Sequence, residues 1–108
     1  MGLFGLFNKK KQAEDLSAYG PLEIEVTESL YSEKEELKIN CKVLSGRVGV
    51  GEELIYHPSY GDKFAVTVTA MEQMMMDLTT AAEGAVLTMT LQGRLNRLTV
   101  SPTDRITR

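Results

Sequence analysis

Short stretches in which apolar and polar residues alternate strictly are the feature of this sequence that most constrains its fold. In residues 22–27, leucine, isoleucine and valine alternate with two glutamates and a threonine. A period of two is typical of a strand with one buried face. Turn-forming segments separate the runs, so the sequence predicts an all-β barrel or sandwich. Comparable runs occupy residues 37–43, 64–70, 86–92 and 97–102.

Cys41, the only cysteine, falls on the apolar side of its run, where we expect a buried and unreactive thiol. A single cysteine excludes an intramolecular disulfide and a cysteine zinc cluster, and it fits a reducing, cytoplasmic location. The other side chains expected to face the core are Leu22, Ile24, Val26, Leu37, Ile39, Val43, Phe64, Val66, Val68, Ala70, Leu87, Met89 and Leu91.

The glycine-rich stretch "VLSGRVGVGEELIYHP", residues 43–58, has two interpretations, a phosphate-binding loop or the corner of a small barrel. Phosphate loops need G-x-x-x-x-G-K-[ST] or G-x-G-x-x-G before a helix, and the spacing of Gly46, Gly49 and Gly51 fits neither. We therefore expect Gly46 to supply the positive φ of a tight hairpin, and Gly51 that of the next bend. The other glycines placed in structural turns are Gly84 and Gly93.

The segment "MEQMMMDLTTAAEG", residues 71–84, is ambiguous because its methionines would also line one side of a helix. It is short, and threonine is a poor helix former, so we predict the end of one strand, a turn, and a weak strand or loop. Methionines fill irregular gaps in cores or form adaptable binding surfaces. We expect gap filling here.

No arrangement of side chains typical of an active site is evident. His57 is the only histidine, which excludes a histidine metal cluster, and it lies in the predicted turn "YHPSYG". Glu52 and Glu53 are adjacent, so on a strand they would point to opposite faces and would not form an acid/base pair. We therefore expect neither an enzyme nor a bound cofactor or metal.

The first residues differ from the rest, and we divide the chain into an N-terminal segment, residues 1–18, flexible or docked, and a barrel domain, residues 19–108. "MGLFGLF" is apolar and "NKKK" is basic, a combination suited to an anionic membrane surface or to a partner. The alternative is a frayed or core-docked tail. The residues of this candidate surface are Leu3, Phe4, Leu6, Phe7, Lys9, Lys10 and Lys11.

The stretch at residues 43–58 resembles the second domain of translational GTPases of the elongation factor Tu type. That family has the pattern V-x-V-G-[DE]-x-[LVI] after a glycine hairpin, and Val48, Val50, Gly51, Glu52 and Leu54 match it. Similar motifs follow in "VTVTAMEQ" and "AAEGAVLTMTLQG", and "RLTVSPTDRI" corresponds to the closing strand, so the likeness spans about residues 21–106. The resemblance implies a small closed or nearly closed antiparallel β-barrel.

Compared with the family it resembles, the sequence lacks the nucleotide-binding motifs of the GTPase domain. In the family this barrel packs on a GTPase domain and helps to hold the acceptor end of aminoacyl-tRNA, and no side chain here matches that role. The sequence has no G-x-x-x-x-G-K-[ST], and Lys11 stands where the guanine-binding N-K-x-D requires aspartate. We therefore expect no GTP binding.

These observations predict a non-catalytic binding module. Its expected partner is a protein, with RNA as the alternative; the net charge of -3 does not favour RNA, because phosphate binders usually carry a basic excess. The alternative function is recruitment to a membrane surface through the apolar and basic N-terminus.

Overall fold

A computed structural model describes residues 16–33, 35–59, 61–93 and 100–108 of the chain. In these residues the secondary structure is β-sheet apart from one turn of 3-10 helix, as the all-β prediction required. The elements are η1 (Leu16–Tyr19), β1 (Glu23–Glu33), β2 (Glu36–Ser45), β3 (Arg47–Gly49), β4 (Glu53–His57), β5 (Phe64–Gln73), β6 (Met76–Leu78), β7 (Thr80–Ala82), β8 (Val86–Gln92) and β9 (Arg105–Thr107).

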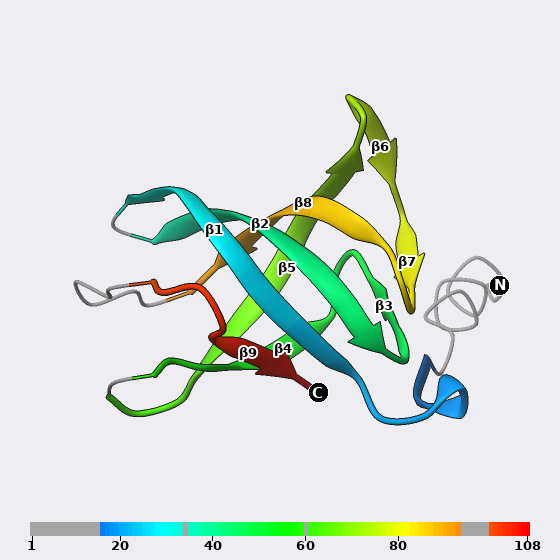
Figure 1. Cartoon of the computed structure of the whole chain (residues 1–108), viewed down its shortest axis with the longest axis horizontal. Coiled ribbons are helices and arrows are strands. Elements are labelled where there is room, and N and C mark those ends of the chain that lie inside the picture. Colours follow the sequence, from blue (N-terminus) through cyan, green and yellow to red (C-terminus); the bar gives the residue numbers. More distant parts are fainter. Residues whose placement is uncertain (1–15, 34, 60, 94–99) are drawn as a thin grey trace, which may run out of the picture.

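Six of the strands form a closed antiparallel barrel (Figure 1). Their order is β4-β9-β1-β2-β8-β5, and β5 pairs again with β4, which closes the ring. β6 continues the sheet beyond β5 and lies outside this ring, while β3 and β7 form a separate two-stranded sheet. The predicted closed barrel is therefore confirmed.

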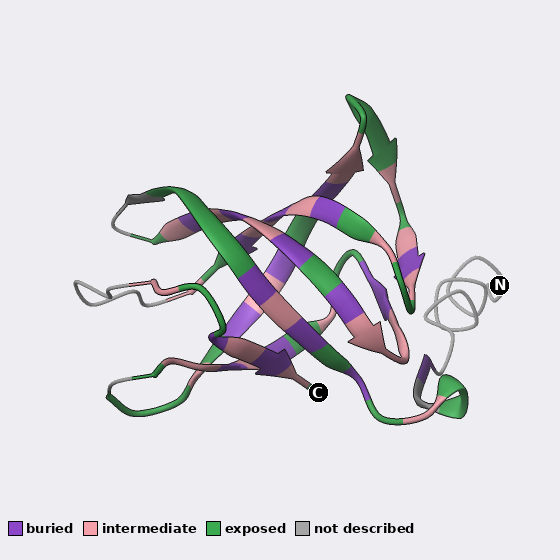
Figure 2. Ribbon diagram, in the orientation of Figure 1, coloured by how far each residue is buried: buried purple, intermediate pink, exposed green. Residues whose placement is uncertain are grey.

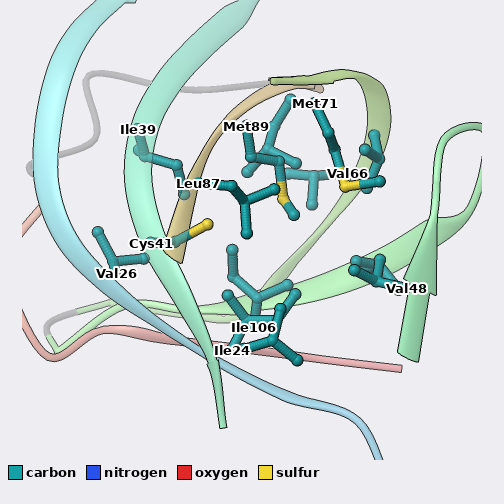
Figure 3. Packing of buried hydrophobic residues seen from close by; sticks show 14 of the residues in the cluster. Ile24, Val26, Ile39, Cys41, Val48, Val66, Met71, Leu87, Met89 and Ile106 are labelled. Atoms are coloured by element: carbon teal, nitrogen blue, oxygen red, sulfur yellow. The ribbon is translucent and has the colours of Figure 1, made fainter. Parts of the chain in front are cut away.

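The alternation in the sequence produces one buried face on each long strand (Figure 2). Inward side chains from opposite sides of the barrel meet in a single apolar core (Figure 3). Tyr56 stacks on Phe64 with ring centroids 5.1 Å apart. Cys41 belongs to this core, as predicted. The other buried members are Leu22, Ile24, Val26, Leu37, Ile39, Val43, Val48, Leu54, Tyr56, Val66, Val68, Met71, Ala81, Leu87, Met89, Leu91 and Ile106.

The alternation breaks within β5, where the prediction of an inward Ala70 is wrong. Val68 pairs with Leu91 and Ala70 with Thr90, so Thr69 is an extra residue without a partner in the register. Such a bulge moves every following side chain to the other face of the strand. Ala70 is exposed as a result, and Met71 takes the core position.

The closing strand also differs from the prediction. Of the run at residues 97–102, only residues 100–102 are described, and they form no strand. The chain turns at Thr103, whose φ is 78°, and the strand that completes the ring is β9 (Arg105–Thr107). β9 pairs with β1 on one side and with β4 on the other.

The glycine stretch forms corners of the barrel. Gly46 has φ 80°, and a Cβ there would lie 2.6 Å from the Pro21 carbonyl oxygen, so only glycine fits. In the described residues β3 pairs with β7 and not with β2, so Gly46 turns the chain from the barrel into the small sheet and does not close the expected hairpin. Gly51 and Gly84 also have positive φ, whereas at Gly93 a Cβ would lie 2.7 Å from the Ala65 carbonyl oxygen.

Candidate functional site

The hairpin between β5 and β6 projects from the barrel and ends in three consecutive methionines (Figure 1). Gln73 pairs with Met76, which leaves Met74 and Met75 as a two-residue loop. Met74 and Met75 are 88% and 89% exposed, and Met76 is 69% exposed. We call Met74, Met75 and Met76 the methionine tip.

The backbone of this loop is unusual for its sequence. Met74 has φ 52° and Met75 has φ 66°, the signs found in a type I′ turn. This turn suits the twist of a hairpin but strongly favours Asn-Gly, because other residues are strained in the left-handed region. The two methionines therefore adopt a conformation that their side chains disfavour.

The expectation that the methionine run fills gaps in the core is wrong for the methionine tip. Met71 is buried and pairs with Leu78 at the base of the hairpin, and the pairing of β5 with β8 ends one residue later, at Glu72 and Thr88. The bulge at Thr69 sets which methionine turns inward. The predicted strand, turn and weak strand over residues 71–84 are present, as β5, the loop, β6 and β7.

The surroundings of the methionine tip are polar and acidic. Glu72 precedes it, Asp77 follows it in β6, and the Gln73 side-chain amide donates a hydrogen bond to the Val86 carbonyl oxygen at 2.9 Å. This bond ties the hairpin to the first residue of β8. The methionine tip is thus an exposed apolar element on a hairpin that is tied to β8.

A buried carboxylate, Asp104, forms a second polar centre that the sequence did not reveal. Asp104 accepts four hydrogen bonds: from the Tyr56 hydroxyl at 2.7 Å, the Ser59 amide at 2.9 Å, the Ser59 hydroxyl at 2.7 Å and the Ser101 amide at 2.9 Å. Burial alone would raise the pKa of Asp104, but the hydrogen bonds to its carboxylate outweigh burial and lower it. Burial and the hydrogen bond to Asp104 raise the pKa of Tyr56. Asp104 is thus an ionised structural anchor.

The other chemically capable side chains have structural surroundings. Burial raises the pKa of Cys41 to about 12, which keeps its thiol protonated and unreactive. His57 is the last residue of β4 rather than part of the predicted turn, and its Nε2 lies 2.8 Å from Thr107 Oγ1 in β9. No group of three or more histidine, cysteine, aspartate or glutamate side chains suited to a metal ion occurs in the described residues.

Glu52 secures the glycine corner. Its carboxylate accepts a hydrogen bond from the Gly49 amide at 2.9 Å and pairs with Arg108 at 2.9 Å. Arg108 also donates to the Arg47 carbonyl oxygen at 2.7 Å, so the last residue of the chain is fixed to the corner. Glu53 is exposed and begins β4, whereas Glu52 precedes that strand, so the two glutamates do not lie on one strand.

The candidate surface at the N-terminus lies outside the described residues, so Leu3, Phe4, Leu6, Phe7, Lys9, Lys10 and Lys11 stay a prediction. The first described residues, η1, pack on β3: Leu16 is buried against Gly49, and the Arg47 guanidinium lies 4.7 Å from the centre of the Tyr19 ring. In the described part of the chain no helix is long and apolar enough to span a membrane.

The fold defined by these strands is the domain 2-like β-barrel of translational GTPases. The GTPase-like domain of Ski7 from S. cerevisiae, bound to GTP, matches with a TM-score of 0.68 and 15% identity over 95% of this chain and 26% of that chain. Elongation factor SelB from Methanococcus maripaludis matches with a TM-score of 0.67 and 15% identity over 96% of this chain and 24% of that one.

A third similar structure is GDP-bound aIF5B from Aeropyrum pernix, with a TM-score of 0.65 and 21% identity over 94% of this chain and 18% of that chain. The chain thus spans between 18% and 26% of the length of these three proteins. Identities at this level establish the fold alone. No protein-family model matches the sequence, and no curated protein matches it.

Proposed function

We propose that the chain is a non-catalytic binding module whose partner is a protein, with RNA as the alternative. The observation that supports this proposal is the methionine tip. Its three side chains are exposed at the end of a projecting hairpin, while the core is filled without them. Exposed apolar groups gathered at one place on a folded domain commonly mark an interaction site.

The non-catalytic part of the proposal rests on what the reactive side chains do. Asp104 is saturated with hydrogen bonds, the Cys41 thiol is buried in the core, and His57 is hydrogen-bonded to Thr107. Each of these groups contributes to the fold, and we expect none of them to exchange a proton or a bond with a substrate. The free thiol of Cys41 also fits the cytoplasmic location that we propose.

A protein partner is preferred to RNA because of charge. The net charge of the chain is -3, and the acidic side chains nearest in sequence to the methionine tip, Glu72 and Asp77, would repel phosphates. The likeness of the barrel to parts of translational GTPases keeps RNA as the alternative.

Two binding experiments test the proposal. The full chain is titrated with total tRNA, and in parallel it is immobilised and exposed to lysate of its host, with excess free chain as competitor. We expect saturable, competable capture of a protein and no saturable binding of tRNA. The absence of saturable binding to both protein and tRNA would contradict the proposed function.

The alternative is recruitment to a membrane surface through residues 1–11, which is proposed from the sequence alone. Co-sedimentation with vesicles that contain anionic lipid tests it, with the chain lacking residues 1–11 as the control. Pelleting that requires these residues would support the alternative, and equal pelleting of the two chains would contradict it.

A further inference from the structure

We infer that the methionine tip is the element that inserts into the partner, and that its receptor is an apolar pocket of a protein bordered by basic side chains. This inference rests on the proposed function, because it names the surface and the chemistry of the partner. It follows from the strain in the loop, the exposure of the side chains and the charge around them.

The first argument is that the loop is not optimised for stability. Met74 and Met75 have positive φ in a two-residue hairpin, where Asn-Gly would meet the same geometry with less strain. Strained backbone persists where the surrounding structure holds it, and it gathers at binding sites. Methionines at both loop positions therefore indicate a requirement for their side chains.

The second argument is that the tip takes no part in the packing of the barrel. Met71 and Leu78 form the last pair at its base, and the described core contains none of the three tip residues. β6 pairs only with β5 in the described residues, so the tip stands clear of the neighbouring strands, and it is exposed throughout (Figure 2). The side chains are therefore free to enter a pocket without unfolding the protein.

The third argument concerns the chemistry of the receptor. Methionine is unbranched and polarisable, and it adapts to irregular apolar pockets. From Phe64 to Gly93 the sequence contains Glu72, Asp77 and Glu83 but no lysine or arginine. Lys42 lies on β2, where it pairs with Val86 of β8, and β8 separates β2 from the hairpin strands. Basic side chains around the receptor pocket would complement these acids.

The same acidic side chains make other binding partners of the methionine tip unfavourable. Anionic lipid and nucleic acid would be repelled by Glu72 and Asp77. Two copies of the chain that met at their tips would bring these like charges together. A protein whose apolar pocket has a basic border is the partner that avoids both kinds of repulsion.

Cross-linking from the methionines tests the inference directly. The full chain is produced with photo-methionine at its methionines, irradiated in host lysate, and the cross-linked peptides are mapped by mass spectrometry. We expect cross-links from Met74, Met75 or Met76 to an apolar segment of a protein flanked by lysine or arginine, and no intermolecular cross-links from the buried Met71 and Met89. Cross-links from the tip only to lipid, to nucleic acid or to a second copy of the chain would overturn the inference.

Matched variants measure the contribution of each feature to binding of the captured protein. The double variant Met74→Asn/Met75→Gly keeps the turn and is expected to raise the dissociation constant by roughly tenfold or more. The control Leu30→Ser, which removes an exposed leucine from β1, is expected to leave the dissociation constant unchanged. Asp77→Lys is expected to weaken binding, and Glu53→Lys, with the same change of charge on β4, is not.

The outcomes separate this inference from the proposed function. A protein captured equally well by the wild type and by Met74→Asn/Met75→Gly would overturn the inference and leave the binding module standing. Failure to capture any protein or RNA would contradict both.

Discussion

At the scale of single residues, the Asp104 carboxylate joins two segments that are far apart in the sequence, residues 56–59 and residues 101–104. Tyr56 belongs to β4, Ser59 follows that strand, and Ser101 precedes β9. A buried carboxylate is costly unless hydrogen bonds compensate its lost hydration, and here four donors do so. The sequence did not reveal this role, because an aspartate in a polar turn usually faces solvent and its partner Tyr56 is 48 residues away.

The Tyr56→Phe variant tests the central hydrogen bond of this cluster. It keeps the stacked ring and removes the hydroxyl that donates to Asp104 at 2.7 Å. We expect the free energy of unfolding to fall by about 1.5–3 kcal/mol, the range for a hydrogen bond to a charged group. Urea denaturation measures the change, and Tyr19→Phe, which removes a more exposed hydroxyl, is the control with a change below about 0.5 kcal/mol. Equal effects of the two variants would contradict the account.

The lowered pKa of Asp104 predicts how stability depends on acid. Because the pKa is lower in the folded than in the unfolded state, the stabilisation is complete above the unfolded-state value of about 3.9 and is lost as pH falls through the folded-state pKa. We expect the unfolding free energy to fall as the pH drops below about 4, and to fall less in Asp104→Asn. Titration of the Asp104 carboxyl carbon by NMR checks the cause in the wild type. A pKa at or above the ordinary value would show the prediction to be wrong.

At the scale of elements, the hairpin of β5 and β6 shows both the strength and the limit of sequence-based prediction. The alternation of residues 64–68 predicted the strand correctly, because one face of β5 is buried. The bulge at Thr69 is not visible in the alternation of apolar and polar residues. The alternation therefore predicts that Ala70 faces the core, whereas in the structure Met71 does. The exposure of the methionine tip depends on where β8 begins, at Val86, which is a property of the sheet and not of the hairpin sequence.

The strained loop predicts that Met74→Asn/Met75→Gly stabilises the protein. Asparagine and glycine relieve left-handed strain of about 1–2 kcal/mol per methionine, so we expect the free energy of unfolding to rise by about 1–2 kcal/mol after the greater flexibility of glycine is included. Chemical denaturation measures the gain. Met76→Ser, at an exposed position outside the loop, serves as the control with little change. A loss of stability in the double variant would contradict the strain.

At the scale of the whole molecule, closure of the barrel depends on β9, a strand of three residues. It bridges β1 and β4, and Ile106 inserts fully into the core between Ile24 and Tyr56. The family resemblance predicted a closing strand in this region. Alternation alone did not, because three residues are too few to establish a period.

Truncation of this inward side chain is expected to weaken the entire fold. Ile106→Ala removes a fully buried side chain and should lower the free energy of unfolding by about 2–5 kcal/mol. Val86→Ala, at a position 58% exposed, is the control with a change within about 0.5 kcal/mol. A two-state denaturation curve measures both variants, and a small effect of Ile106→Ala would indicate that β9 does not close the ring.

The size of the methionine tip also sets the expected strength of binding. Full burial of a methionine contributes about 1.5–3 kcal/mol, so three contribute about 5–9 kcal/mol before the entropic cost of association. A tip of this size used alone therefore supports a transient complex, with micromolar or weaker affinity. Tighter binding would require a second contact surface on the barrel.

Oxidation of the methionines by dilute peroxide, followed by mass spectrometry, tests most directly whether this barrel binds through its methionine tip. In the free chain we expect rapid oxidation of Met74, Met75 and Met76 and slow oxidation of the buried Met71 and Met89. In the complex captured from host lysate, the three tip residues should become as slow as the buried pair. Unchanged rapid oxidation of the tip in that complex would contradict the account.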